Sequence, residues 1–257
     1  MKCSLNFYNV GFKSAITDKE INEFGSAQQH FSDCYIMTTL ETLSHTENGR
    51  NILKKQIEHD DYNPNMINCY VYAPDGFREK YSIPTDTAVK GYEKLYKAQD
   101  NEIVRSVDVT IGEYEKRYKA KPWICRFTDN FKTYTFENSL PSHFMKIFTG
   151  IEPTINIAET DFNIDLTSKK DEVMKLFERM DKDKNHSIVI ATGVKMLDGR
   201  NWHVYVLKDV NLTNNTITVK NKRGNITKVM DIDEALNTFK YIVGYFNSDL
   251  EQIKSTD

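Results

Sequence analysis

The chain has 257 residues, which is enough for one large domain or for two lobes that share an active-site cleft. Hydrophobic residues make up 39% of it and aromatic residues 12%, so a packed core is expected rather than disorder. The net charge of −3 provides no basic surface for nucleic acid or anionic lipid, and neither class of partner is expected. Nothing in the pattern indicates an oligomer.

The four cysteines are scattered and lack the Cys-x-x-Cys spacing of many metal and redox sites; they are Cys3, Cys34, Cys69 and Cys125. Free thiols in a reducing compartment are therefore expected. The first residues contain no apolar signal-peptide region, and no later apolar run reaches membrane-spanning length. We expect a soluble protein, either cytoplasmic or delivered into a host cytosol, with no cofactor and no metal.

In chain order, a polar arm over residues 1–27 leads to the most informative segment, which surrounds Cys34. Polar residues precede this cysteine, and apolar residues follow it at helical spacing through Leu43. Cys34 is therefore expected in the first turn of a helix, with Asp33 as the N-cap. A helix N-terminus favours negative charge, so we expect a lowered pKa for the thiol. Gln28 can donate its amide to a developing oxyanion, together with the backbone N–H of Cys34.

The rest of the first 150 residues has helical patterns around one hairpin. The expected elements are a helix over 46–57 capped by Thr46, a hairpin over 67–83 that turns at Pro74-Asp75-Gly76, and helices over 103–120 and 142–148. Gly150 follows the last of these helices and is the expected hinge point between two lobes.

Beyond residue 150 the pattern changes from helices to strands. The expected elements are a helix capped by Ser168, strands over 186–194, 202–208, 216–220 and 226–230, a helix started by Asp231, and a strand over 241–246. Helices first and strands second indicate an α+β fold. We expect a helical lobe over 1–150 and a β-rich lobe over 151–257, together forming one catalytic domain.

The strand over 202–208 carries a second informative residue, His203. Folding the following hairpin about Thr213 places His203 opposite residue 222 or 223, so Asn221 lies at the same end of the sheet. The side-chain oxygen of Asn221 can then accept from one imidazole nitrogen and leave the other to face a thiol. Asp209 is a weaker partner, because six residues of extended strand separate it from His203 by about 20 Å.

Each of these residues also has a purely structural interpretation, as a buried cysteine, a strand histidine and a turn asparagine. Their order, Gln28, Cys34, His203 and Asn221, resembles the active site of calpain-type cysteine proteases, which belong to the papain-like class. The likeness includes an acidic residue directly before the cysteine, an aromatic residue after it and an apolar helix. It implies a papain-like core with the active site in a cleft between the two lobes.

The sequence departs from the family pattern at three places. Ser32 stands where the family has glycine, and Tyr35 stands where tryptophan is usual. After Asn221 the family commonly has Pro-Trp, whose tryptophan shields the His–Asn bond from water, whereas this chain has Lys222-Arg223. The third departure leaves the expected fold unchanged and weakens the expectation of vigorous catalysis.

The resemblance implies a cysteine endopeptidase that hydrolyses proteins or peptides through a thioester acyl-enzyme. Cys34 is the expected nucleophile, and His203 takes its proton or holds it as an ion pair. Asn221 orients His203, and Gln28 contributes to the oxyanion hole. An intracellular housekeeping enzyme and an effector secreted into another cell both fit. We favour the effector, because nothing else in the chain supplies regulation or an address.

Two alternatives stay open. A thioester accepts water or an amine, so the same fold can act as a deamidase, a transglutaminase or an acyltransferase. The other alternative is a binding module with a protease fold and weakened catalysis, which Lys222-Arg223 motivates.

Other motifs give weaker signals. Residues 181–185 imitate the start of a calcium-binding EF-hand loop, but His186 replaces the glycine at the sixth position and Thr192 the glutamate at the twelfth. We expect a solvated turn there and a structural role for His186 in its strand. His30 and His143 have no second ligand at metal-binding spacing, so no metal site is expected.

Overall fold

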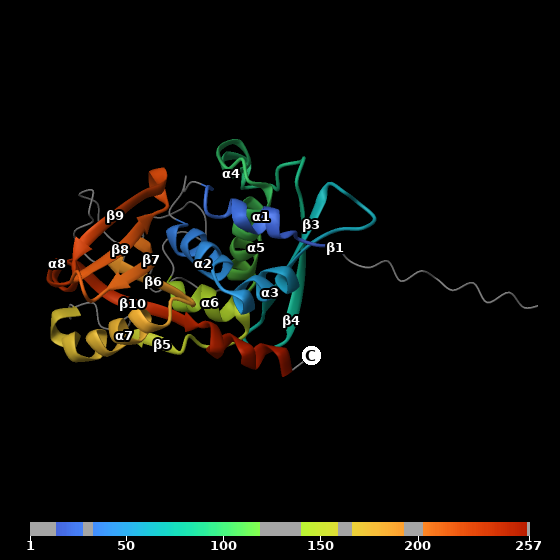
Figure 1. Cartoon of the computed structure of the whole chain (residues 1–257). Coiled ribbons are helices and arrows are strands. Elements are labelled where there is room, and N and C mark those ends of the chain that lie inside the picture. The colour runs from blue at the N-terminus through green and yellow to red at the C-terminus, as the bar shows by residue number, and fades with distance from the viewer. Residues whose placement is uncertain (1–13, 28–32, 119–139, 159–165, 193–202, 256–257) are drawn as a thin grey trace, which may run out of the picture.

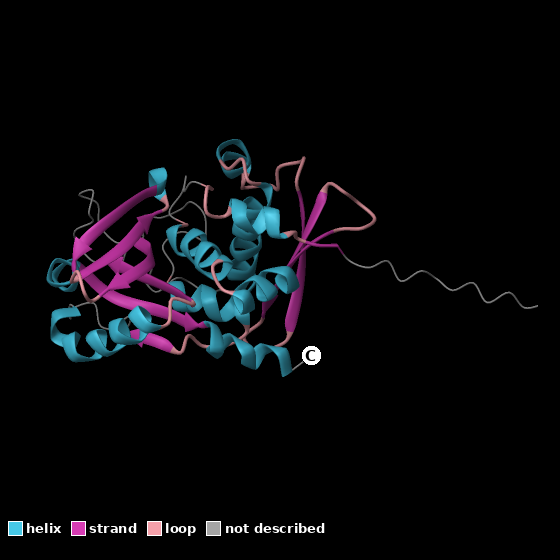
Figure 2. Cartoon of the chain, in the orientation of Figure 1, coloured by secondary structure: helices cyan, strands magenta, loops and turns pink. Residues whose placement is uncertain are grey.

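The computed structural model describes residues 14–27, 33–118, 140–158, 166–192 and 203–255 of the chain. Within these ranges the fold is α+β, with two antiparallel sheets (Figure 1). Most helices of the first half gather beside a small sheet, and a larger sheet from the second half lies on their other side (Figure 2). No helix in the described ranges is long and apolar enough to cross a membrane.

The elements of the first half are mainly helices. They are α1 (Asp18–Glu23), α2 (Cys34–Ser44), α3 (Glu47–Gln56), α4 (Glu93–Ala98), α5 (Glu102–Tyr118) and α6 (Pro141–Thr149). The small sheet has the order β1-β2-β3-β4, formed by Ser14–Ala15, Ile57–His59, Met66–Tyr72 and Arg78–Pro84. The predicted helix over 46–57 and the hairpin over 67–83 are confirmed, with shifts of a residue or so at their ends.

The second half forms a six-stranded sheet with the order β5-β10-β6-β7-β8-β9. Its strands are β5 (Ile155–Ile157), β6 (His186–Thr192), β7 (Val204–Asn211), β8 (Thr216–Asn221), β9 (Ile226–Asp231) and β10 (Phe239–Phe246). The helical segments of this half are the 3₁₀ turns η2 (Leu166–Lys169), η3 (Arg223–Asn225) and η4 (Asn247–Ser255), and the α-helices α7 (Lys170–Lys182) and α8 (Ile232–Thr238).

Local chemistry explains where several helices begin and end. The Thr46 hydroxyl accepts from the backbone N–H of Gly49 and so caps α3, as predicted. Asp231 caps α8 by accepting from the N–H of Asp233. Gly150 ends α6 in the left-handed region, with φ of 82°, which a residue without a Cβ adopts at little cost.

The predicted cap at Ser168 is wrong. This residue lies inside the 3₁₀ turn η2, and Lys169 is the N-cap of α7. The chain enters α7 through a tighter turn, so the helix begins at Lys170, later than the polar pattern indicates.

Both faces of the larger sheet are covered. Successive side chains of a strand point to opposite faces, and β6 divides accordingly. Val189 and Ala191 join the core that contains α2, whereas Ile188 and Ile190 join a second core with Phe177 of α7. The first core therefore contains residues from both halves of the chain.

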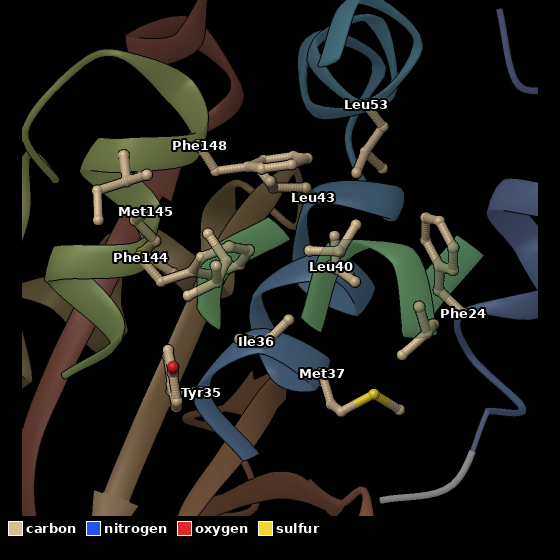
Figure 3. Close-up of a cluster of buried hydrophobic side chains, with 14 of the residues drawn as sticks. Phe24, Tyr35, Ile36, Met37, Leu40, Leu43, Leu53, Phe144, Met145 and Phe148 are labelled. Atoms are coloured by element: carbon tan, nitrogen blue, oxygen red, sulfur yellow. The ribbon is translucent and has the colours of Figure 1, made fainter. Parts of the chain in front are cut away.

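Helix α2 lies at the centre of the first core, and every one of its residues is buried. Figure 3 shows its apolar side chains among those of the neighbouring helices. Those labelled on α2 are Tyr35, Ile36, Met37, Leu40 and Leu43, and those around it are Phe24, Leu53, Phe144, Met145 and Phe148. Because it is enclosed on all sides, α2 is a rigid support for whatever its first residue does.

Candidate active site

The structure places three of the four predicted site residues on adjoining elements. Cys34 is the first residue of α2, His203 directly precedes β7, and Asn221 is the last residue of β8. All three are buried, with 8%, 5% and 9% of their surface exposed. Gln28, the predicted oxyanion-hole residue, lies outside the described residues.

The predicted hydrogen bond between His203 and Asn221 is present. The imidazole Nε2 lies 2.7 Å from the amide Oδ1 of Asn221. The register of β7 and β8, in which Val206 pairs with Lys220, brings the two residues to the same end of the hairpin. The expected position of His203 opposite residue 222 or 223 agrees with this register.

A second hydrogen bond determines the protonation of the imidazole. The backbone N–H of Arg223 donates to the same Oδ1 of Asn221, at 2.9 Å. A backbone N–H can only donate, so the Asn221 atom between the two partners is the oxygen. The Nε2 of His203 must therefore carry the proton in this bond. In the neutral ring Nδ1 is then the basic nitrogen, the one able to accept a proton.

The backbone and the ring of His203 are also held in place. Its N–H lies 3.2 Å from the hydroxyl of Thr192, and the Thr192 N–H donates to its carbonyl at 2.9 Å. The ring meets that of Tyr205 edge to face, with 4.9 Å between the ring centroids. The imidazole thus has one orientation, set by the end of β6, by β7 and by β8.

Cys34 lies against the start of β7, but its thiol is not activated as predicted. Burial raises the pKa of Cys34 to about 12, against a smaller lowering by a hydrogen bond from the backbone of Val204. The charge of Asp33 raises it further. The predicted lowering of this pKa by the helix N-terminus is therefore wrong, because desolvation of the thiolate outweighs the helix effect. The thiol is protonated at neutral pH.

Asp33 occupies the N-cap position of α2, as predicted, but its side chain makes no capping hydrogen bond. The carboxyl groups of Asp33 and Asp108 instead face each other, and both residues are fully buried. Burial, and then the charge of Asp33, raises the pKa of Asp108 well above its ordinary value. The raised pKa favours the protonated form of Asp108 beside Asp33.

Lys222, the residue directly after Asn221, is fully buried. Its Nζ lies 2.8 Å from the carboxylate Oε2 of Glu41 on α2. Sequence reasoning missed this ion pair. The available signal was that Glu41 is the one charged residue in the apolar segment 34–44, and buried acids usually have a cationic partner.

The motifs that were set aside also have structural roles. His186 lies at the far end of β6 from Thr192, and its ring meets that of Phe246 edge to face. The turn after α7 is held by Asp183, which accepts from the N–H of Asn185. Among the described residues, no group of three or more His, Cys, Asp and Glu side chains is arranged to hold a metal ion.

No family model matches the chain, and no curated protein matches it.

Proposed function

We propose that this chain is a papain-like cysteine protease of calpain type that hydrolyses peptide bonds in proteins or peptides. The observation that carries the proposal is the His203–Asn221 hydrogen bond at the start of β7, where the backbone of Val204 also meets the sulfur of Cys34. This arrangement presents a thiol, an oriented imidazole and an orienting amide in the order of a Cys-His-Asn triad.

The chemistry begins with a neutral thiol, because the pKa of Cys34 is about 12. Of the two roles considered for His203, accepting the proton during attack therefore fits better than holding a preformed ion pair. The sulfur attacks the carbonyl carbon of the peptide, and the thiol proton passes to Nδ1 of His203. The carbon–nitrogen bond then breaks, and the leaving amine takes that proton, which leaves a thioester on Cys34.

Hydrolysis of the thioester repeats the same transfers. Nδ1 of His203 accepts a proton from water as the water oxygen attacks the thioester carbon. The carbon–sulfur bond breaks, the acid product leaves and the proton returns to sulfur. Throughout, Asn221 accepts from Nε2–H and keeps Nδ1 directed at the reacting atoms. In this proposal Gln28 and the backbone N–H of Cys34 stabilise the oxyanion.

The state of the cysteines supports a proposal for the compartment in which the enzyme works. Cys34 and Cys69, the two cysteines within the described residues, are both free and buried. Free thiols suit a reducing compartment, so we place the enzyme in a cytosol, with delivery into a host cell as the favoured setting. Its partner is a protein or peptide substrate, with no role for nucleic acid or membrane.

A second candidate function is a protease-fold binding module with little catalysis. The observation that favours it is the raised pKa of Cys34, since a protonated thiol is a weak nucleophile unless a base removes its proton. The two functions differ in whether His203 removes the proton of the Cys34 thiol when a peptide is bound.

Peptide cleavage tests the proposal. A diverse peptide library incubated with the wild-type protein is expected to gain new termini, identified by mass spectrometry, and Cys34→Ala is expected to produce none. A one-unit mass increase on glutamine without new termini would assign the site to deamidation instead. If wild type and Cys34→Ala give the same products, the proposed function is wrong.

A further inference from the structure

Lys222 is the residue directly after Asn221, and its side chain is fully buried. Lysine is rarely buried completely unless its charge is paired and its hydrogen bonds are met. The Nζ of Lys222 lies 2.8 Å from Glu41 Oε2, 2.6 Å from the carbonyl of Phe24 and 3.1 Å from that of Gly25. The ammonium group thus donates hydrogen bonds to the two carbonyls and forms an ion pair with Glu41.

The ion pair with Glu41 joins Lys222 to α2, the helix that begins at Cys34. Glu41 follows Cys34 by seven residues, nearly two turns, so the two side chains leave α2 on the same face. Glu41 is 1% exposed, and Lys220 of β8 also reaches it, with 3.0 Å between Nζ and Oε1. Burial acts to raise the pKa of Glu41, but the ammonium groups of Lys222 and Lys220 bring it below its ordinary value, so the carboxylate is ionised. Burial lowers the pKa of Lys222, and the charge of Glu41 opposes that lowering.

The two carbonyl acceptors join Lys222 to the chain that leads toward Gln28. Phe24 is the C-cap of α1, and Gly25 follows it. A second bond ties the same stretch to the turn after β8, since Nδ2 of Asn225 donates to the carbonyl of Ser26 at 2.6 Å. The turn that contains Lys222 is therefore bonded both to α2, which carries Cys34, and to the stretch after α1, which precedes Cys34 in the chain.

We propose that Lys222 is a positioning residue for the Cys-His-Asn site. Its ion pair and two hydrogen bonds hold Asn221, and through Asn221 the imidazole of His203, in register with Cys34 on α2 and with the segment that leads to Gln28. Lys222 does not touch the reacting atoms. The expected effect of Lys222 on the reactivity of Cys34 rests on the proposed function. Its expected effect on the His203–Asn221 bond does not depend on any activity.

The buried charge of Lys222 holds the turn after β8 in a fixed position relative to α2. Removal of the ammonium takes the donor from the Phe24 carbonyl and the nearest cation from Oε2 of Glu41. Lys220 still reaches the Gly25 carbonyl and Oε1 of Glu41, but the β8 turn loses its buried contact at Lys222 and can shift relative to α2. A shift of about 1 Å in a reacting group can lower a rate by about 100-fold. Through its ion pair and hydrogen bonds, Lys222 therefore holds the residues of the site in place from the position directly after Asn221.

The test uses Lys222→Met, which keeps an unbranched side chain as far as Cε and removes the ammonium group, with Lys228→Met as the matched control. Lys228 is on β9, where it is half-exposed and pairs with Glu234 at 2.8 Å. Two quantities are measured on folded protein: the NMR signal of the His203 Nε2–H in protein with ¹⁵N-labelled histidine, and the rate of Cys34 labelling by a peptidyl epoxide. Thermal melts establish that each variant is folded.

We expect Lys222→Met to broaden or abolish the Nε2–H signal and to slow labelling by about 10- to 100-fold. Lys228→Met is expected to change neither. Glu41→Gln keeps the size of the side chain and removes the charge that pairs with Lys222, so it is expected to have the same two effects as Lys222→Met. If Lys222→Met does not fold, Glu41→Gln is the deciding variant. A folded variant with an unchanged signal and an unchanged rate would overturn the inference. If wild-type Cys34 is never labelled but the signal still depends on Lys222, positioning stands and the proposed function fails.

Discussion

His203→Ala is expected to lower the rate of peptide hydrolysis by about 10²- to 10⁴-fold, the usual contribution of a positioned acid–base group. The expected loss is large because the thiol starts protonated, with a pKa of about 12, and Nδ1 of His203 is the base that can take its proton. The fold is expected to survive, because His203 lies at the edge of the two cores, directly before β7, and its ring is hydrogen-bonded to Asn221 and packed edge to face on Tyr205 rather than enclosed within either core. Initial rates on the best peptide of the library measure the effect.

His59→Ala is the matched control. His59 lies in the small sheet on β2 and pairs with Glu20 at 2.8 Å, so its removal is expected to leave the rate unchanged. Asn221→Ala is expected to give an intermediate loss, since it frees the imidazole to rotate without removing the base. Equal rates for wild type and His203→Ala would eliminate His203 as the proton acceptor.

Glu115→Gln is expected to stabilise the protein increasingly as the pH rises. Glu115 lies on α5, is 2% exposed, and burial raises its pKa to about 9 from an ordinary value of 4.5. Between these values the folded protein keeps a proton that the unfolded chain releases, so the unfolding free energy of the wild type falls as the pH rises. The stabilising contribution is complete below the unfolded pKa and is lost as the pH rises toward 9.

Linkage sets the size of this effect at about 1.4 kcal/mol for each pH unit. The glutamine variant is neutral at every pH, so its advantage over the wild type is expected to grow by about 3 kcal/mol between pH 6 and pH 8. Urea denaturation at both pH values measures it. Glu113→Gln, on the same helix but ion-paired at the surface with Lys116, is the control. A difference between wild type and Glu115→Gln that does not change with pH would show that Glu115 is ionised in the folded protein.

Local patterns were sufficient for the elements that carry the site. The apolar spacing after Cys34 predicted α2, and the alternation around His203 with the turn-rich stretch after it predicted the β7–β8 hairpin. The His203–Asn221 bond followed from that register alone. These predictions succeeded because a hairpin's register depends on residues that are close in the sequence.

The features that sequence reasoning missed depend on residues brought together by the tertiary fold. The pairing of Asp33 with Asp108 requires α5 to pack behind the start of α2, and the Lys222–Glu41 pair requires β8 to pack against it. The prediction of a lowered pKa for Cys34 was wrong for the same reason. A helix N-terminus is a local feature, whereas the burial that outweighs it is produced by the whole core.

One measurement tests the central claim most directly: the labelling of wild-type protein and His203→Ala by a peptidyl epoxide at neutral pH, mapped over all four cysteines. Cys69 is an internal reference, because burial raises its pKa to about 12, like that of Cys34. Any difference in reactivity between these two thiols therefore comes from access and from His203 rather than from their pKa values. We predict that Cys34 alone is modified and that His203→Ala greatly slows its modification. Labelling of Cys34 no faster than that of Cys69, or at the same rate without His203, would contradict the triad and leave the binding module as the better account.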